Sequence, residues 1–321
     1  MKKLMFILMA VGLAFFYSCQ SDGPIAGNDD SPDVEAIKTL LSDSADVNFD
    51  ALDEESESNI DNDGPSSALD KEIVRTRFVR IRRHPVERTV EVTKETDSTA
   101  TAYVKTTFEG ILKIKKAVLT DSSLNIEWYD KPIRHTVERY VHLKKFFDNA
   151  DAPHRGWRVV GISLQNGFSK QPGVQIVELV IKPENQDSVV ITDPLEFFQD
   201  GINLFTFPRY TKVHLRVKVK NTTPNPIVYP EGTEATETVL LHFGRNPRFA
   251  RAHFGRAWFT YVGKDNAGNN VYSGTWTVMQ IPGLHHAVVD VIDNGTILEK
   301  SVEDYPYVSA TWGSLYRVTR F

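Results

Sequence analysis

The sequence has a single cysteine, Cys19, among its 321 residues. No disulfide can form within the chain, and a CxxC-type zinc or redox site is excluded. The basic residues are spread along the chain rather than gathered into a cluster that binds nucleic acid. Stability must therefore come from ordinary hydrophobic cores, and we expect no nucleic-acid partner, no metal and no cofactor.

Long apolar runs are also missing. The run at residues 4–17 is shorter than the roughly 20 residues that cross a bilayer core as a helix. It follows a positively charged start and ends at a small residue, Ser18, as the apolar region of a secretory signal peptide does. We therefore predict that residues 1–18 are a signal peptide and that the remainder is soluble.

The cysteine follows this segment directly, and the junction resembles the lipobox of bacterial lipoproteins. The resemblance implies that the Cys19 thiol carries a diacylglyceryl group and becomes an acylated N-terminus after cleavage. Phe16 and Tyr17 differ from the usual leucine and small residue of that motif, so the alternative is an ordinary signal peptide with a chance cysteine. Gln20, rather than aspartate, follows the cysteine, which in such lipoproteins implies the outer membrane. The side of that membrane stays open.

Charge is unevenly divided along the chain. Residues 20–70 contain 15 acidic residues and one basic residue, Lys38, whereas residues 71–321 contain 34 basic and 27 acidic residues. A chain of like charges repels itself and stays extended, so we interpret residues 19–32 as an acidic tether. The alternative is an export or surface-display signal after the cysteine, formed by Asp22, Asp29 and Asp30.

One helical pattern lies within the acidic stretch. Apolar residues recur at helical spacing over residues 33–53, Ser31 can cap the helix, and Pro32 suits its first position. Residues 53–67 are polar and predict a flexible loop. The spacing of apolar residues over 72–84 slightly favours a second helix over a first strand.

From residue 86 the pattern changes to period two, which is typical of half-buried antiparallel strands. The segments that follow it are 86–92, 100–114, 133–143 and 156–165. The order of helix, acidic loop and long strands resembles the nuclear-transport-factor-2-like superfamily. This resemblance covers residues 33–170 and implies an α+β cone, which is a curved antiparallel sheet with N-terminal helices.

The cone of that superfamily often encloses a pocket, which in its enzymes holds a general base. Arg88, His135 and Arg139 would face its interior here, either as a cluster for an anionic or carbonyl ligand or as satisfied structural residues. No paired acid lies on the same face, and a general base needs a positioned partner. We therefore favour the structural interpretation and assign no catalytic residue.

The second half, residues 171–321, has many short strand patterns separated by turns, which is typical of a β-sandwich. Residues 282–293 resemble the late strand of surface-type immunoglobulin-like domains. His285 takes the position of the tyrosine that hydrogen-bonds its own corner there, so we interpret it as structural. The implied fold is an all-β immunoglobulin-like sandwich, which by itself names no function.

The stretch 243–259 interleaves arginines with aromatic residues. It is interpreted either as an exposed loop that stacks on sugars or clamps an anionic partner, or as a sandwich loop whose aromatics fold back into the core. The candidate ligand residues are Arg245, Arg248, Arg251, Arg256 and Trp258.

The sequence as a whole predicts an outer-membrane lipoprotein with a non-catalytic binding or assembly role. Its partners would be the membrane, through the lipid, and a protein or glycan that the sequence does not identify. The alternatives are an isomerase- or cyclase-like enzyme acting in the cone pocket and a carbohydrate-binding surface module.

Overall fold

The computed structural model describes residues 31–48, 73–120, 123–245 and 255–320. Its helices are α1 (Pro32–Asp43), α2 (Ala45–Asn48), α3 (Asn294–Leu298) and a short 3-10 helix, η2 (Pro153–Gly156). The strands of the first half are β1 (Ile73–Lys94), β2 (Thr99–Thr120), β3 (Ser123–Lys145), β4 (Trp157–Ser163) and β5 (Gln165–Ser169). Those of the second half are β6 (Val174–Pro183), β7 (Val189–Ile191), β8 (Phe198–Asp200), β9 (Phe205–Pro208), β10 (Lys212–Asn221), β11 (Glu237–Arg245), β12 (Gly255–Trp258), β13 (Thr260–Lys264), β14 (Asn270–Thr277), β15 (Gly283–Asp293) and β16 (Ser309–Thr319).

The predicted α+β cone with N-terminal helices is wrong. The described residues are mostly strand, and the helices before the first strand are only α1, with 12 residues, and α2, with four. Strands of 22, 22 and 23 residues follow and form one continuous meander. The inner face of this meander is covered at one end by the short helices α1 and α2 and elsewhere by β11, β15 and α3 of the second half, so the fold needs no longer helices to close its core.

The segment for which a helix was favoured, residues 72–84, is also corrected. It belongs to β1, which pairs with β2 along its length. Phe78 and Arg80, two positions apart, are buried on the inner face, and Val79 and Ile81 are buried on the other. Burial on both faces produces an apolar run without strict alternation, and short runs of this kind cannot be distinguished from a helix by periodicity.

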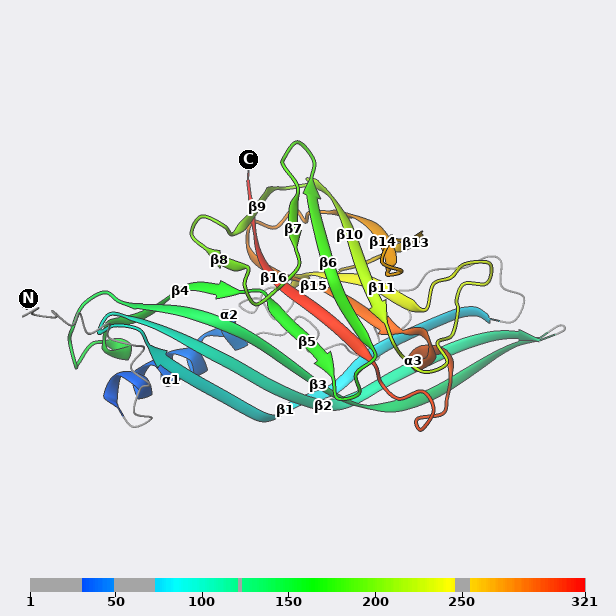
Figure 1. The fold of residues 1–321 in the computed structure, drawn as a ribbon, viewed down its shortest axis with the longest axis horizontal. Helices are drawn as coiled ribbons and strands as arrows, with labels where there is room; N and C mark the ends of the chain where they lie inside the picture. The colour runs from blue at the N-terminus through cyan, green and yellow to red at the C-terminus, as the bar shows by residue number, and fades with distance from the viewer. Residues whose placement is uncertain (1–30, 49–72, 121–122, 246–254, 321) are drawn as a thin grey trace, which may run out of the picture.

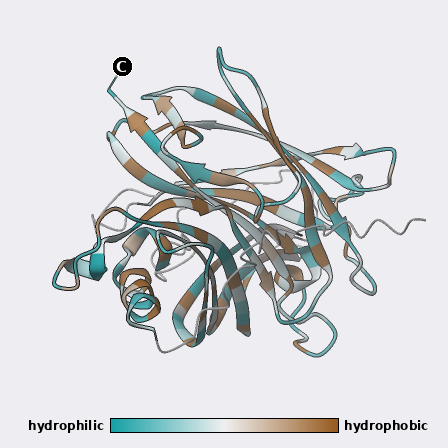
Figure 2. Cartoon of the chain, turned by 60° about the vertical axis from the view of Figure 1, so that its left-hand side comes forward, coloured by the Kyte–Doolittle hydropathy of each residue, from teal (hydrophilic) through white to brown (hydrophobic). Residues whose placement is uncertain are grey.

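The described strands form two sheets (Figure 1). The large sheet runs in the order β1-β2-β3-β5-β16-β15-β11-β12, with β4, β8 and β9 attached at its side. The small sheet runs in the order β13-β14-β10-β6-β7. The described part of the protein is therefore β-rich, with sheets compatible with a β-sandwich, and the residues along its strands alternate in hydropathy (Figure 2).

The large sheet curls so that its two edges approach each other. Arg256 on β12 donates a hydrogen bond from Nη1 to the backbone oxygen of Phe78 on β1, at 3.0 Å. The ring of Trp258, also on β12, packs edge-on against the ring of Phe78. The strands β11, β15 and β16 thereby become a middle layer, with the small sheet on one face and the β1–β3 meander on the other.

β15, the central strand of this middle layer, packs against the small sheet on one face and against the meander on the other. From His285 to Asp293 every residue of β15 is buried. Ala287, Val289 and Val291 belong to the sandwich core with the small sheet, whereas Ile292 packs with Phe78 and Leu112 of the meander. Strands buried on both faces have near-continuous apolar sequences, which is what this segment shows.

Helix α1 covers one end of the meander. Val34, Ile37 and Leu41, the residues predicted to share its buried face, are at most 1% exposed, and the Ser31 hydroxyl accepts a hydrogen bond from the Val34 amide as predicted. Asp33, in the first turn, lies near three cations, Lys94, Lys145 and Arg155, at 2.9–3.5 Å. Burial by itself raises the pKa of Asp33, but these partners outweigh it and hold the pKa below its usual value.

The second half agrees with most of the predicted strands. The inward residues of β10 are fully packed, and His285 Nε2 makes a hydrogen bond of 2.9 Å with the Ile281 carbonyl at its own corner, which confirms its structural role. After β15 the chain forms the short helix α3, which the Asp293 side chain caps by accepting from the Gly295 amide.

The predicted boundary at residues 170 and 171 cuts across this architecture. β5 lies before it, yet pairs with β3 on one side and with β16 on the other. We therefore expect the full chain to unfold in one cooperative transition, whereas fragments 31–170 and 171–321 expressed separately should show none. Calorimetry of the two fragments and of their mixture checks this. A cooperative melt of either fragment alone would show that the boundary separates independent domains.

Candidate functional site

The inner face of β3 carries a basic residue at every fourth position. Lys131, His135 and Arg139 are at most 6% exposed and alternate with Ile133 and Val137. His135 and Arg139 therefore share one buried strand face, as the sequence predicted. Buried charged or polar groups must be hydrogen-bonded to be tolerated, so their partners decide what this face does.

The centre of this interior is an ion pair between Arg80 on β1 and Asp290 on β15. The guanidinium donates from Nη1 to Oδ2 at 2.7 Å and from Nη2 to Oδ1 at 2.9 Å, and both side chains are fully buried. This two-point geometry matches the planar fork of arginine to the carboxylate. The pair joins residues 210 positions apart in the sequence.

The remaining acceptor positions of Asp290 are filled by two further side chains. His242 Nε2 lies 3.0 Å from Oδ2, and the Ser309 hydroxyl donates to Oδ1 at 3.2 Å. Each carboxylate oxygen thus has two donors, which is about its full capacity. Because the ionised carboxylate can only accept, Nε2 of His242 carries the proton.

His135 is connected to the same cluster through a tyrosine. Arg80 Nε donates to the Tyr307 hydroxyl at 3.0 Å, and that hydroxyl lies 3.3 Å from Nδ1 of His135. The other ring nitrogen, Nε2, lies 3.2 Å from the Thr311 hydroxyl. Since Tyr307 accepts from Arg80, its own proton is free to go to Nδ1, which places the imidazole proton on Nε2.

This network contains the residue types of a catalytic site, but its polar groups are already bonded to one another and cannot reach a substrate. Burial by itself would raise the pKa of Asp290, but the Arg80 charge and the bonds from His242 and Arg80 hold that pKa well below its usual range. At neutral pH Asp290 is thus an ionised acceptor with no vacant position. A general base must be able to reach a proton of the substrate, and these packed groups reach one another instead.

Lys131 lies further along the same strand. Its ammonium donates to the carbonyl oxygen of Gly295 at 3.3 Å and to that of Tyr305. Burial lowers the pKa of Lys131 to about 8, while Glu299 and Asp293 raise it to a smaller extent. The residue fastens the α3 segment to β3 through neutral carbonyls rather than through a counter-ion.

The other two predicted pocket residues are held by the N-terminal helices. Arg139 donates to the Gln165 side chain and, at 3.2 Å, to the Asp46 carbonyl. Arg88, which is exposed, donates at 3.2 Å to the Leu41 carbonyl at the end of α1. Arg88 and Arg139 thus both donate to carbonyl oxygens of the N-terminal helices, and the grouping of Arg88 with His135 and Arg139 stays a prediction.

The candidate ligand residues on β12 serve the closure of the large sheet. Arg256 and Trp258 both contact Phe78 on β1, as described above, and the Arg256 guanidinium also lies 5.6 Å from the Phe78 ring centre. This matches the interpretation in which the aromatics of this stretch fold back. Arg248, Arg251 and the Arg245 side chain lie outside the described residues.

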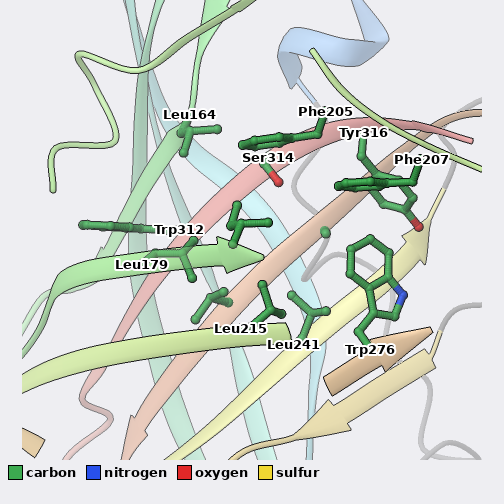
Figure 3. Close-up of a pocket in the computed structure, with 13 residues that line it drawn as sticks. Leu164, Leu179, Phe205, Phe207, Leu215, Leu241, Trp276, Trp312, Ser314 and Tyr316 are labelled. Atoms are coloured by element: carbon green, nitrogen blue, oxygen red, sulfur yellow. The ribbon is translucent and has the colours of Figure 1, made fainter. Parts of the chain in front are cut away.

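A cavity between the two sheets of the sandwich is lined by aromatic and aliphatic side chains (Figure 3). Phe205, Phe207, Trp276, Trp312 and Tyr316 surround it, yet it encloses only about 20 Å³. One water molecule needs roughly 10–15 Å³, so a cavity of this volume is too small for a ligand larger than a water. The cavity belongs to the packed core.

The larger candidate is a groove where α1 ends beside the β3–β4 connection. It has a volume of about 410 Å³, within the range of roughly 300–1,000 Å³ typical of ligand sites. Both apolar and polar residues line it: Leu40, Asp43, Ser44, Phe147, Pro153, His154, Gly156, Trp157, Arg158 and Val159. We call this feature the α1 groove.

The floor of the α1 groove depends on an unusual backbone. His154 and Arg155 have φ of 49° and 52°, and Gly156 has φ of 82°. A Cβ at Gly156 would lie 2.1 Å from the Phe147 carbonyl oxygen, so only glycine fits there. The Arg155 side chain secures the segment by donating from Nε to Asp33 at 2.9 Å. Such backbone strain occurs often at ligand-binding sites.

Two side chains give the α1 groove its chemical character. Trp157 is 1% exposed, and its indole N–H has no hydrogen-bond partner within the described part of the chain. Phe147 is 45% exposed, with the Arg158 guanidinium 6.0 Å from its ring centre. The groove therefore combines a buried indole N–H, without a partner among the described residues, with an exposed aromatic face.

Sequence reasoning placed the candidate pocket on the strand faces and missed the α1 groove. The signal available was the segment 146–157, in which two phenylalanines precede a Pro-His-Arg-Gly-Trp run. The local sequence of this segment does not, however, indicate that the end of α1 lies beside it.

Within residues 31–48, 73–120, 123–245 and 255–320, no group of three or more His, Cys, Asp or Glu side chains is arranged to hold a metal ion. Over the same residues no helix is long and apolar enough to cross a membrane. The chain matches no family model, and comparison with curated proteins and with solved structures finds no match.

The buried ion pair is tested by Asp290→Asn. The variant leaves the Arg80 charge buried without a counter-ion, so we expect it to lower the free energy of unfolding by about 3–5 kcal/mol at pH 7. Because the folded-state pKa of Asp290 is lowered, this stabilisation should be present above the unfolded-state pKa of about 3.9 and be lost as the pH falls below it. Urea denaturation from pH 2 to 7 measures both effects.

The matched control is Glu87→Gln, which removes one of the two exposed carboxylate partners of Arg134. Exposed pairs contribute little, so this change should alter the free energy of unfolding by less than about 1 kcal/mol. An Asp290→Asn variant as stable as Glu87→Gln at neutral pH would contradict the assigned role of the pair.

Proposed function

We propose that this chain is a lipid-anchored protein of the cell envelope with a binding role rather than a catalytic one, and that the α1 groove is its binding site. The observation that carries the proposal is the groove itself, whose volume and strained floor are features of ligand sites; within the described part of the chain, the buried Trp157 indole N–H beside it has no hydrogen-bond partner. The buried titratable cluster supports the non-catalytic part, since the donors around Asp290 fill all its acceptor positions.

The proposed anchor is Cys19, and it lies outside the described residues. It precedes the cap of α1, Ser31, by a short acidic stretch, so a lipid on Cys19 would hold the α1 groove close to the membrane surface. Two or more acyl chains are needed for stable attachment, and a lipoprotein N-terminus supplies them. We propose the outer membrane as the location, on the evidence of the lipobox-like junction and Gln20.

Among partner classes, we propose a glycan for the α1 groove. Sugars present hydroxyl groups beside apolar C–H faces, and the groove offers polar groups on Asp43, Ser44 and His154 beside the apolar faces of Leu40 and Phe147. The sequence offered sugar binding as one of two interpretations of the stretch 243–259, whose described residues Arg256 and Trp258 instead contact β1. The cone-pocket enzyme required the cone fold and is not proposed.

The groove is tested by titrating the full chain with soluble muropeptides and with lipopolysaccharide-derived oligosaccharides in a calorimeter. We expect one of these probes to bind, and Trp157→Phe to weaken that binding about three- to tenfold. The reason is that the variant removes a hydrogen bond of roughly 0.5–1.5 kcal/mol while keeping an aromatic ring in place.

The matched control is Trp128→Phe, which changes an exposed tryptophan at the far end of the molecule and should leave binding unchanged. Equal binding by the wild type and Trp157→Phe, or no heat with either probe, would overturn the assignment of the groove to a glycan.

The anchor is tested by Cys19→Ala in cells supplied with a labelled fatty acid. We expect the wild type to incorporate the label and sediment with membranes, and the variant to lose both properties, because a lipid-bearing thiol is then missing. Ser21→Ala serves as the neighbouring control and should retain the label. Label that persists in Cys19→Ala would contradict lipidation at this residue.

A further inference from the structure

The β2–β3 hairpin reaches the end of the molecule opposite α1, and one edge of it is bare (Figure 1). β2 pairs with β3 from residue 123 to residue 144 without a register shift. On its other side β3 pairs with β5 and β4, but those pairs begin only at His135. Among the described strands, none pairs with β3 between residues 123 and 134 on that side.

The backbone groups that point to this bare edge can be identified by parity. In an antiparallel strand, alternate residues direct both N–H and C=O to the same neighbour. The Arg134 carbonyl accepts from the Lys170 amide at 2.9 Å, and the Tyr140 amide donates to the Ser163 hydroxyl at 2.9 Å, both away from β2. Leu124, Ile126 and Trp128 have the same parity, so their backbone groups face the bare edge.

The same three residues expose large apolar side chains. Leu124 is 56% exposed, Ile126 is 52% exposed and Trp128 is 50% exposed, and all three lie on one face because they alternate along the strand. The opposite face of the hairpin is covered, since Lys116 donates to the Leu298 carbonyl and Tyr129 to the Ile297 carbonyl. An exposed apolar edge strand is a template for pairing with another strand.

We propose that this edge pairs with a second copy of the chain, β3 against β3 in antiparallel orientation, about a two-fold axis through Ile126. A two-fold contact requires a self-complementary surface, in which each residue meets its own counterpart or a fixed partner. In this register Ile126 meets Ile126 of the second copy, and Leu124 meets the second copy's Trp128. The backbone parity established above makes these three the hydrogen-bonded positions.

The side chains fit this register without a conflict of charge. On the exposed face all directly opposed pairs are apolar, and the Lys115 ammonium, 5.0 Å from the Trp128 ring centre, lies one strand further in. On the other face Glu127 meets the second copy's Asn125, so no two like charges are directly opposed. Aromatic and aliphatic cross-strand pairs of this kind stabilise antiparallel sheets.

The length of the contact is limited by the start of β3. In this register Ser123, the first residue of β3, meets the second copy's Tyr129, so the pairing spans residues 123–129 and ends before Pro132, which has no N–H to donate. A contact of this length buries less than the roughly 1,200 Å² typical of stable interfaces, so we infer a weak dimer.

The test is site-directed cross-linking in the full chain carrying Cys19→Ser, so that an introduced cysteine is the only thiol. Directly opposed hydrogen-bonded positions have Cα atoms about 5.5 Å apart, within disulfide range. Ile126→Cys should therefore form a disulfide-linked dimer under mild oxidation. Leu124→Cys should not cross-link to itself but should do so when mixed with Trp128→Cys.

Two controls make this outcome decisive. Lys105→Cys, at an exposed position on β2 away from the edge, should not cross-link. Ile126→Lys should shift sedimentation equilibrium toward the monomer with an unchanged melting temperature, because it sets two charges against each other across the axis.

The proposal is overturned if Ile126→Cys links no faster than Lys105→Cys, or if Leu124→Cys links to itself as fast as to Trp128→Cys. It is also overturned if the Cys19→Ser chain stays monomeric at millimolar concentration but binds anionic phospholipid vesicles through Trp128. The exposed side chains of Leu124, Ile126 and Trp128 would then form a membrane contact.

Discussion

The ion pair between Arg80 and Asp290 is the constraint on which the architecture depends. Moving two charges out of water is costly, and the cost is offset only when both are fully paired. Asp290 lies on a strand buried on both faces, so no solvent can serve as its partner. β1 must therefore lie across β15 in one register, and the large sheet has to curl to bring it there. A sheet slipped by one residue would place an apolar side chain opposite the carboxylate and leave it without a counter-ion.

The curl explains why the second half does not behave as a free-standing sandwich. Its sheet of β11, β15 and β16 presents one face to β6, β10 and β14 and the other to the meander, so one set of strands contributes to two cores. Arg256 and Trp258 complete the arrangement by linking β12 to β1. Residues that look like an exposed recognition loop in the sequence are thereby used to close a sheet.

The two proposed interaction sites lie at opposite ends of the long axis (Figure 1). The α1 groove lies at the end where the described chain begins, a short stretch after Cys19, and the bare edge of β3 lies at the other end. An anchored molecule arranged in this way can hold a ligand near the membrane and meet a second copy through the hairpin. The rigid connection between the two is the meander itself, whose strands run from one end to the other.

The sequence by itself determined the local structure, because capping and periodicity act over a few residues. The Ser31 cap, the buried face of α1, the inward residues of β10 and the corner bond of His285 could all be predicted. Only the tertiary structure decided that 72–84 is a strand, since burial on both faces removes the alternation of apolar and polar residues that identifies a strand. It also decided that Asp290 pairs with Arg80, and that Trp157 lies beside the end of α1. These contacts join residues far apart in the chain, and no local pattern distinguishes one distant partner from another.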